Sequence, residues 1–320
     1  MNKPSLDSML ADKDSIISGF EKIQKVISSK YFYDTRGSEL FDQITNQDEY
    51  YPTSKEINIL KEKKEIFSKI LPNNASVIEF GSGSSKKIIS FLKAINTPKE
   101  YFPVDISEHF LKKNLLVFSK TFPLIKTKPV CSDFFDTENV KLILNNYIKK
   151  NNDLIGFFPG STIGNFKPSI AKKLLKKFSK ILNKNNYLVI GVDLLKNKKI
   201  LEKAYNDKNG ITKKFNLNIL DRLNNELDAN FIKSNFEHLA FFNNKYNRIE
   251  MHILSKIKQT VRILNKNFKF RKGETIHTEN SYKYSIDDFN KILQETGFKR
   301  ISVLTDCNEY FGIFVYRVHE

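Results

Sequence analysis

The chain has 320 residues, and its 53 lysines and arginines outnumber its 36 aspartates and glutamates, so the formal net charge is +17 at pH 7. Hydrophobic residues make up 40% of the sequence, with 27 Phe and 13 Tyr among them. A chain of this length with so much aromatic side-chain area can bury a sizeable core, which excludes intrinsic disorder as its main state and suits one large domain or two coupled ones.

The cysteine count and the apolar runs indicate a compartment. Two cysteines, Cys131 and Cys307, are too few for a disulfide framework and fit a reducing environment, in which we expect both as core or near-core thiols. No apolar run approaches the roughly 18 residues of a membrane span, and the N-terminal stretch has early acidic residues instead of the apolar block of a secretory signal. The sequence therefore predicts a cytoplasmic protein without a membrane segment.

The positive charge raises the question of a nucleic-acid partner. In residues 171–182 (AKKLLKKFSKIL), apolar side chains recur at helical spacing and lysines fill the other positions, as in an amphipathic helix with a solvated face. We therefore interpret the charge as a solubilising surface, with a polyanion-facing patch as the alternative. We expect a monomer that binds no nucleic acid.

The N-terminal part of the chain has a helical pattern. Residues 5–29 carry apolar positions at helical spacing and predict a helix. Residues 48–53 predict a loop, because Pro52 disfavours the helical conformation of Tyr51. The threonine or serine that follows the proline is suited to cap the next helix.

From residue 75 the pattern alternates between buried strands and helices. The predicted strands are residues 76–80, 101–105, 130–135, 154–158 and 187–192. This alternation predicts an α/β fold, with a Rossmann-like doubly wound parallel sheet and helices on both of its faces.

The alternation stops near residue 196. Residues 196–227 have a helical pattern and residues 235–283 a pattern of longer strands. A helix and two strands of the earlier kind follow, at 286–296, 300–305 and 311–318. The sequence therefore predicts a helical N-terminal segment (1–60), a nucleotide-binding-type domain (61–195 and 284–320) and an α+β domain inserted into it (196–283).

The clearest chemical signal is the segment 77–87 (VIEFGSGSSKK), where a strand gives way to a helix. Gly81 and Gly83 let a ligand approach the backbone, and the helix N-terminus offers free N–H groups. A dinucleotide fingerprint would need a third glycine where the chain has Lys86, which disfavours a nicotinamide or flavin cofactor. The Glu79-x-Gly81-x-Gly83 form instead resembles the first motif of class I S-adenosylmethionine-dependent methyltransferases, whose cofactor has no pyrophosphate.

Two acidic residues follow the next two predicted strands. Asp105 ends the second strand, where a carboxylate can accept both hydroxyls of a ribose. Asp133 follows the third strand and is placed to accept from an adenine amino group, while Phe134 covers the ring. Because ligands gather at the carboxyl ends of strands, we interpret this set as an S-adenosylmethionine site, with ordinary capping acids at strand ends as the alternative.

Other catalytic patterns are missing from the sequence. The five histidines, at positions 109, 238, 252, 277 and 319, form neither an H-E-x-x-H motif nor a close pair, and no C-x-x-C occurs, so we expect no metal site. Residues 160–164 (GSTIG) match the G-x-S-x-G nucleophile motif only superficially, because the serine is one position early.

Stretches along most of the chain resemble one family. They are residues 31–42 (YFYDTRGSELFD), 49–53 (EYYPT), 79–87 (EFGSGSSKK), 160–165 (GSTIGN), 191–194 (GVDL), 204–207 (AYND), 215–218 (FNLN), 249–251 (IEM) and 278–281 (TENS). Together they resemble the histidine-specific N-α-methyltransferases of ergothioneine biosynthesis. Proteins of that family trimethylate the α-amino group of L-histidine to hercynine with three S-adenosylmethionine molecules, so the resemblance implies an enzyme with L-histidine as its small-molecule substrate.

The resemblance also implies a role for each matching residue. The cofactor-binding positions are Gly81, Gly83, Lys87, Asp105, Asp133 and Phe134. Tyr33 matches a catalytic residue that lies near both the reacting amine and the cofactor. The substrate-binding positions are Gly160, Asn165 and Tyr205, the last two on the amino-acid backbone, then Tyr50, Glu279 and Ser281 on the imidazole, and Met251 as a wall of the imidazole pocket.

The chemistry of two residues agrees with these roles. A carboxylate at Glu279 accepts strongly from an imidazole N–H, and Ser281, two residues further along a strand, points the same way. The plainer alternatives are a water-facing strand glutamate and, for Asn165, a helix cap. Spacing leaves open whether Tyr50 or Tyr51 contacts the substrate. The alternative functions are a methyltransferase of the same fold that acts on another amino acid, RNA or protein, and a small-molecule binding protein without catalysis.

Overall fold

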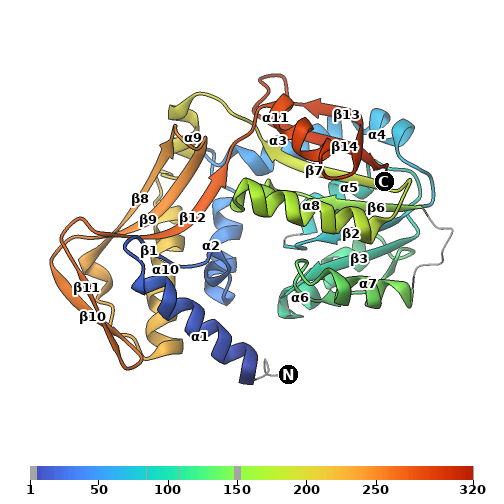
Figure 1. Cartoon of the computed structure of the whole chain (residues 1–320). Helices are drawn as coiled ribbons and strands as arrows, with labels where there is room; N and C mark the ends of the chain where they lie inside the picture. The colour runs from blue at the N-terminus through green and yellow to red at the C-terminus, as the bar shows by residue number, and fades with distance from the viewer. Residues whose placement is uncertain (1–5, 84, 107, 148–152, 320) are drawn as a thin grey trace. The chain divides into compact units, whose positions relative to one another are not determined.

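The computed structural model describes residues 6–83, 85–106, 108–147 and 153–319, so Ser84 of the glycine loop lies outside the described residues. The chain forms two compact units (Figure 1). Unit 1 comprises the described residues up to Tyr51 together with Asn197–Ser281, and unit 2 comprises Pro52–Lys196 with the residues from Tyr282 onward.

Unit 2 is built on an eight-stranded sheet. Its strands are β2 (Ser76–Phe80), β3 (Glu100–Asp105), β4 (Lys126–Thr127), β5 (Val130–Cys131), β6 (Leu154–Phe158), β7 (Tyr187–Asp193), β13 (Phe298–Thr305) and β14 (Phe311–Val318). The order is β13-β14-β7-β6-β2-β3-β4, and β5 also pairs with β3. The central strands β3, β2, β6 and β7 are parallel neighbours, which confirms the predicted Rossmann-like, doubly wound architecture.

One strand differs from the predicted parallel sheet. β14 runs antiparallel to both β7 and β13. The connection from β13 to β14 spans only residues 306–310, and a connection this short can join antiparallel neighbours but not parallel ones. The sheet is therefore parallel at its centre and antiparallel around β14.

Helices cover both faces of this sheet. One face is packed by α7 (Thr137–Asn145), α8 (Pro168–Leu182) and α11 (Ile286–Gln294). The other is packed by α3 (Tyr51–Glu62), α4 (Lys64–Ile70), α5 (Ser85–Leu92) and α6 (Glu108–Thr121). Ile78 belongs to the first core and its neighbour Val77 to the second, because successive side chains of a strand point to opposite faces.

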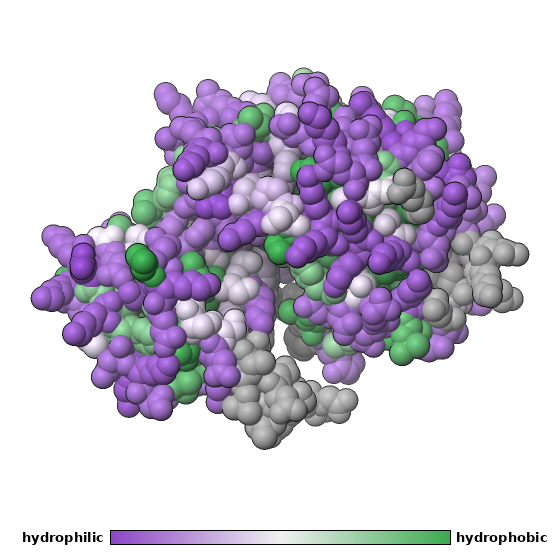
Figure 2. Space-filling view, viewed as in Figure 1, coloured by the Kyte–Doolittle hydropathy of each residue, from purple (hydrophilic) through white to green (hydrophobic). Residues whose placement is uncertain are grey.

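The lysine-rich helix α8 has the two faces that its pattern predicts. Its apolar residues Leu174, Leu175, Phe178, Ile181 and Leu182 are buried. The lysines at positions 173, 176, 177 and 180 are exposed. Hydrophilic residues also dominate the surface seen in Figure 2. In the described part of the chain, no helix is both long and apolar enough to cross a lipid bilayer.

Two predicted boundaries near the N-terminus were wrong. Helix α1 (Leu6–Glu21) ends well before residue 29, and Lys25–Val26 forms the short strand β1. Helix α3 begins at Tyr51, inside the predicted loop, with Pro52 in its first turn. A proline is tolerated there because the N–H it lacks would have no partner within the helix.

The third predicted strand and the predicted state of the cysteines were also wrong. The strand expected over 130–135 ends at Cys131, because Asp133 Oδ1 accepts the backbone N–H of Phe135 at 2.8 Å and bends the chain into a turn. Cys131 at the end of β5 and Cys307 in the β13–β14 connection are exposed free thiols instead of core residues.

Unit 1 contains a four-stranded sheet and a separate hairpin. The sheet has the order β1-β12-β9-β8, with β12 (Thr275–Tyr282), β9 (Arg248–Ser255) and β8 (Phe236–Asn243), and the hairpin pairs β10 (Gln259–Ile263) with β11 (Lys266–Phe270). The helices besides α1 are α2 (Thr35–Ile44), α9 (Lys198–Ala204), α10 (Ile211–Leu227) and the 3-10 helices η1 (Ser29–Phe32) and η3 (Lys233–Asn235).

Helix α10 is fastened to this sheet by Asn216, whose side chain is buried. The amide nitrogen of Asn216 donates to the backbone carbonyl of His252 at 2.8 Å, and its amide oxygen accepts from the hydroxyl of Thr278 at 2.8 Å. The same nitrogen lies 2.9 Å from His238 Nδ1, so one side chain links α10 to β8, β9 and β12.

At the end of β7, a buried carboxylate pairs with two buried lysines. Asp193 lies 2.6 Å from Lys283 Nζ and 2.6 Å from Lys196 Nζ, and the three side chains are at most 5% exposed. Burial alone would raise the pKa of Asp193, but the two ammonium groups outweigh it and hold that pKa below its usual value. Burial lowers the pKa of Lys196 to about 8.

We predict that Asp193→Ala lowers the free energy of unfolding by about 3–5 kcal/mol, because it leaves two buried ammonium groups without their counter-charge. Urea denaturation followed by circular dichroism measures the change. Glu295→Ala is the control. It breaks only an exposed ion pair with Lys172 and should leave the urea midpoint of unfolding unchanged. A loss no larger than that of the control would show that the cluster does not stabilise the fold.

Candidate active site

In unit 2, the glycine loop lies at the carboxyl end of β2. Gly81 has a φ of +74°, a conformation that favours glycine, and a side chain there would begin 3.5 Å from the ring of Phe134. The N–H groups of Gly81 and Ser82 donate to the carbonyl of Val104 at 2.9 and 3.0 Å, which ties the loop to β3. The loop therefore presents bare backbone beside an aromatic ring, as a bound adenosine group requires.

Glu79, the acid of the Glu-x-Gly-x-Gly motif, is linked to this loop by hydrogen bonds. Its side chain is 1% exposed and accepts from the hydroxyl of Tyr101, which also lies 3.0 Å from Ser82 Oγ. Burial raises the pKa of Glu79 to about 7, and the nearby charge of Asp105 adds to this effect. The carboxyl group is therefore part of the packing under the loop, and it titrates near neutral pH.

Lys87 is held by a residue that the sequence analysis missed. Its Nζ lies 3.0 Å from Glu56 Oε2, and Glu56 is fully buried in α3. The same carboxylate accepts the N–H of Gly160 at 2.9 and 3.0 Å. Gly160 has a φ of +79°, and a side chain there would start 2.8 Å from Lys87 Nζ. One sequence signal was available: Glu56 falls on the apolar face of its helix, three and four positions before Ile59 and Leu60.

The two acids of the predicted cofactor set lie at the ends of neighbouring short strands. Asp105 ends β3 and is half-buried, and Asp133 is exposed in the turn after β5. One oxygen of Asp133 is used by the Phe135 N–H. Phe134 is partly buried, and its ring lies 5.6 Å from the ring of Phe158, so it also packs into the core beneath the loop.

The loop after β6 contains Ser161 and Asn165. Ser161 is buried with a φ of +55°, and its hydroxyl accepts the N–H of Asp193 at 2.9 Å, which is a structural role and not that of a nucleophile. Asn165 ends the 3-10 helix η2 (Thr162–Asn165) and is half-buried. The N-cap of α8 is Lys167, so Asn165 does not cap that helix.

In unit 1, a chain of aromatic contacts runs from Tyr33 to β12. Ring centroids are 5.8 Å apart between Tyr33 and Phe41, 6.3 Å between Phe41 and Tyr50, and 6.2 Å between Tyr50 and Tyr205. The hydroxyl of Tyr205 then lies 2.8 Å from Ser281 Oγ. Four residues that are far apart in the sequence and were predicted to form the site, Tyr33, Tyr50, Tyr205 and Ser281, are thus joined by direct contacts.

Phe215 of α10 completes this cluster and was given no role in the sequence analysis. Its ring lies 6.0 Å from Tyr33, 5.9 Å from Phe41 and 4.4 Å from Phe32. The signal for it was its membership of the family-like stretch 215–218. Tyr51 is buried in the first turn of α3.

A histidine forms a hydrogen bond with the backbone of Tyr205. His238 Nε2 donates to the Tyr205 carbonyl at 2.9 Å, and His238 Nδ1 accepts from Asn216 at 2.9 Å. Burial lowers the pKa of His238, and the Asn216 amide that donates to Nδ1 leaves the ring proton on Nε2. Met251 of β9 is buried, and Glu279 of β12 is half-buried and does not face water freely.

The structure thus distributes the predicted residues over both units. Unit 2 contains Gly81, Gly83, Lys87, Asp105, Asp133, Phe134, Gly160 and Asn165, and unit 1 contains Tyr33, Tyr50, Tyr205, Met251, Glu279 and Ser281. Unit 1 also gathers Glu250, His252 and His277, whose ligand-type atoms lie within 4.8 Å of one another, a cluster that the spacing of histidines in the sequence did not predict.

Comparison with known proteins gives consistent matches. The model of a family described as histidine-specific, S-adenosylmethionine-dependent methyltransferases matches residues 12–318. The chain is 33% identical to the histidine N-alpha-methyltransferase of Mycobacterium tuberculosis, over 95% of this chain and 94% of that protein. It is 28% identical to ergothioneine biosynthesis protein 1 of Neurospora crassa, over 96% of this chain but 34% of that protein. Among solved structures, it resembles an S-adenosylmethionine-dependent methyltransferase from Clostridium acetobutylicum, at 11% identity and a TM-score of 0.45 over 83% and 92% of the two chains; this is a likeness of fold alone.

We predict that stability falls with rising pH because of Glu79. Between pH 4.5 and 7 the native state keeps the Glu79 proton, whereas the unfolded state has released it. The free energy of unfolding therefore falls by about 1.4 kcal/mol for each pH unit, and by about 3 kcal/mol over the whole range. Glu79→Gln removes this contribution. Denaturant titrations at several pH values should therefore show wild type losing stability relative to Glu79→Gln across this window.

The matched control is Glu62→Gln, at an exposed position of α3, whose stability curve should run parallel to that of wild type. A difference between wild type and Glu79→Gln that stays constant from pH 4.5 to 7 would contradict the raised pKa.

Proposed function

The chain belongs to the histidine-specific, S-adenosylmethionine-dependent methyltransferase family, and we propose that it methylates the α-amino nitrogen of L-histidine three times to give hercynine, as in ergothioneine biosynthesis. Its cofactor is S-adenosylmethionine, which supplies the methyl group on a sulfonium. The observation that carries the choice of substrate is the run of contacts from Tyr33 through Tyr50 and Tyr205 to Ser281, on the strand that also carries Glu279.

The residues of unit 2 suit the cofactor. We assign the cofactor's carboxylate to Lys87, whose ammonium group Glu56 holds in place, and the ribose hydroxyls to Asp105. Phe134 would cover the adenine beside the bare backbone of Gly81, with Asp133 accepting from the adenine amino group. Gly160 and Asn165 are assigned to the amino-acid part of the substrate.

The chemistry needs a neutral amine, a close approach and little water. The α-amino group of a free amino acid is mostly protonated at pH 7, and each pH unit below its pKa adds about 1.4 kcal/mol to the cost of removing the proton. Tyr33 would orient the amine and pass its proton to water. In each transfer the nitrogen lone pair forms the N–C bond and the C–S pair stays on sulfur, so most of the rate comes from holding the reacting atoms together.

The aromatic cluster of unit 1 suits the product. After the third transfer the nitrogen is a permanent cation, and aromatic faces stabilise such cations by about 0.5–2 kcal/mol each. Tyr33, Phe41 and Tyr50 are the rings that we assign to this role, with Tyr33 acting as the catalytic residue. Phe215 lies edge to face with Tyr33 and at a tilt to Phe41, and it keeps the cluster packed.

Selectivity for histidine is assigned to β12. Glu279 would accept the imidazole N–H, and Ser281, oriented by the Tyr205 hydroxyl, would serve the second ring nitrogen. Met251 would form an apolar wall of this pocket. We assign Tyr50 and not Tyr51 to the substrate, because the Tyr50 ring contacts the ring of Tyr205, which is also assigned to the substrate.

We extend the proposal to the organisation of the chain. Residues 1–60 and the insertion 196–283 would bind the substrate, and residues 61–195 with 284–320 would bind the cofactor. We further propose a monomer in a reducing, cytoplasmic environment, which suits two exposed thiols that form no disulfide.

We predict that the purified protein converts L-histidine and S-adenosylmethionine into mono-, di- and trimethylated histidine, detected by mass spectrometry over time. A panel of the other free amino acids serves as the control and should give no product, because they lack the imidazole N–H that Glu279 accepts. Methylation of a different amino acid in preference to histidine would overturn the substrate assignment while leaving the cofactor assignment intact.

We predict that Glu279→Ala weakens L-histidine binding by about 10- to 100-fold, the loss expected for one hydrogen bond to a charged group, and leaves S-adenosylhomocysteine affinity within about twofold. Asp105→Ala is the matched variant and should do the reverse. Isothermal titration calorimetry with each ligand measures both. Equal loss of both ligands in Glu279→Ala would mean that Glu279 is structural, and unchanged cofactor affinity in Asp105→Ala would refute the ribose assignment.

A further inference from the structure

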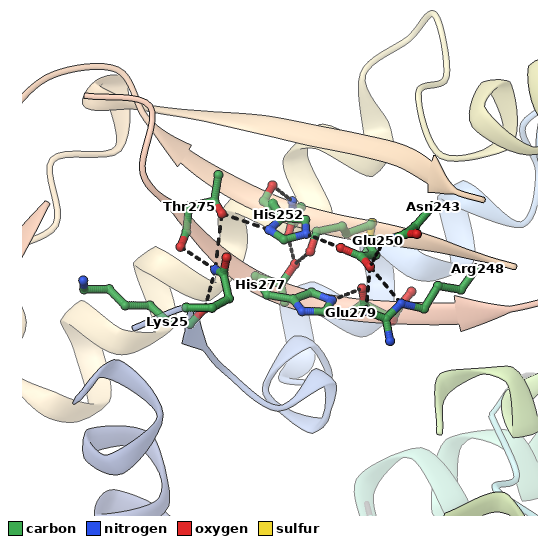
Figure 3. Close-up of polar contacts among 12 residues, drawn as sticks. Lys25, Asn243, Arg248, Glu250, His252, Thr275, His277 and Glu279 are labelled. Carbon is green, nitrogen blue, oxygen red and sulfur yellow. Dashed lines mark hydrogen bonds and ion pairs between the residues drawn. The ribbon is translucent and has the colours of Figure 1, made fainter. Parts of the chain in front are cut away.

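Three aromatic rings stack across neighbouring strands of unit 1. Phe241 of β8 lies 5.4 Å from His252 of β9 with planes 20° apart, and His252 lies 4.5 Å from His277 of β12 with planes 8° apart. Figure 3 shows the two imidazoles one above the other, with Glu250 and Glu279 beside them. His277 is on the same strand as Glu279, two residues before it.

The stacking argues against a metal site at Glu250, His252 and His277. A metal ion binds an imidazole nitrogen in the plane of the ring at about 2.0–2.1 Å, and one ion cannot lie in two nearly parallel planes whose ring centres are 4.5 Å apart. In addition, Glu250 already accepts from Nε and Nη2 of Arg248 at 2.8 and 2.6 Å, so a metal cation there would meet the guanidinium.

The hydrogen bonds of His252 immobilise the middle ring of the stack. Its Nε2 donates to Glu250 Oε2 at 3.0 Å, and its Nδ1 accepts from the hydroxyl of Thr275 at 3.0 Å. Both ring nitrogens are used, so His252 forms a fixed plate against which His277 packs. Burial, with a smaller contribution from the neighbouring His252, lowers the pKa of His277 to about 4, so His277 is neutral at pH 7.

His277 binds the backbone of β12 just beyond the point where β1 ends. β1 pairs with β12 only over Lys25–Val26, and its last bond runs from the Ile27 N–H to the His277 carbonyl at 3.0 Å. Carbonyls two residues apart on a strand point to the same side, so the Glu279 carbonyl faces the position where β1 has already ended and the chain has turned into η1. His277 Nε2 donates to that carbonyl at 3.1 Å (Figure 3).

We propose that His277 is a positioning residue for Glu279: by binding the Glu279 carbonyl it holds the backbone of this residue in register, and thereby aims the carboxylate at the substrate imidazole. This inference rests on the proposed function, in which Glu279 reads the imidazole. A buried or partly buried backbone carbonyl needs a hydrogen-bond donor, and the strand β1 on this side of β12 ends at Val26.

Two substitutions separate the donor from the ring. His277→Phe keeps a flat ring in the stack but has no N–H, and His277→Gln keeps an amide N–H at similar reach but has no ring. We expect His277→Phe to raise the KM for L-histidine about five- to tenfold, the usual effect of one lost hydrogen bond, and His277→Gln to stay within about twofold of wild type. Both should leave kcat and the KM for S-adenosylmethionine within about twofold, since only substrate binding is affected.

A double-mutant cycle tests whether His277 acts through Glu279. In a Glu279→Gln background, His277→Phe should change the KM for L-histidine by less than about twofold, because the carboxylate that it positions is gone. His319→Gln, an exposed histidine in unit 2, is the control and should change neither KM. If His277→Phe does not fold, His277→Ala compared with His277→Gln tests the donor with no ring in either variant, and we then expect Ala to have the KM at least about fivefold higher.

The outcomes distinguish the two proposals. Three outcomes would overturn the positioning role while histidine methylation stands. His277→Phe could raise the KM for L-histidine and the KM for S-adenosylmethionine equally, or raise the KM for L-histidine equally in the wild-type and Glu279→Gln backgrounds. The third outcome is a KM for L-histidine in His277→Gln that is no lower than in His277→Phe or His277→Ala. A wild-type protein that neither binds nor methylates L-histidine would overturn the proposed function and this inference with it.

Discussion

A buried carboxylate is costly unless a cation or N–H donors compensate it, and this constraint organises both units of the chain. Glu56 joins the ammonium group of Lys87 to the backbone of Gly160, and Asp193 pairs with two lysines at the end of β7. Glu250 of β9 pairs with Arg248 and His252 of the same strand and accepts from Asn243 of β8. Glu56 and Asp193 connect segments that are distant in the sequence, and Glu56 contacts two residues that we assign to ligands. The positions of these residues therefore depend on charge compensation as much as on apolar packing.

Methyl transfer asks little of acid–base groups, which agrees with the residues that the units provide. Once the amine has lost its proton, the rate of methyl transfer depends chiefly on the positions of the reacting atoms. Rigid groups can hold the reacting atoms in position, and the units provide three kinds: rings packed edge to face at Tyr33 and Phe41, a hydroxyl pair at Tyr205 and Ser281, and a strand edge held by His277. Selectivity for an imidazole would then come from one carboxylate held in a fixed direction. A side chain without the matching N–H would leave that carboxylate buried without a hydrogen bond, which lowers the binding affinity.

Local patterns predicted most of the secondary structure but not all of its boundaries. The strands 76–80 and 154–158 agree with the sequence, because short buried apolar runs between turn residues are strong local signals. The boundaries near Pro52 and Asp133 were predicted wrongly. Pro52 is accommodated in the first turn of a helix, and the Asp133 side chain accepts the Phe135 N–H that would otherwise bond to a neighbouring strand. The direction of β14 was missed although a local signal was present, since the connection over residues 306–310 is too short to join parallel neighbours.

The amino-acid sequence alone established the alternating α/β architecture, the glycine loop around Gly81, and the family, because periodicity and short motifs are properties of neighbouring residues. Folding brought together what no spacing could indicate: Glu56 with Lys87, the rings from Tyr33 to Tyr205, and His277 against His252. These contacts arise from the packing of one element on another and from the pairing of strands that lie apart along the chain. The partner of a side chain across a sheet depends on the register and the order of the strands, which residues far apart in the sequence determine. The residues that hold the candidate site in place could therefore be identified only from the tertiary structure.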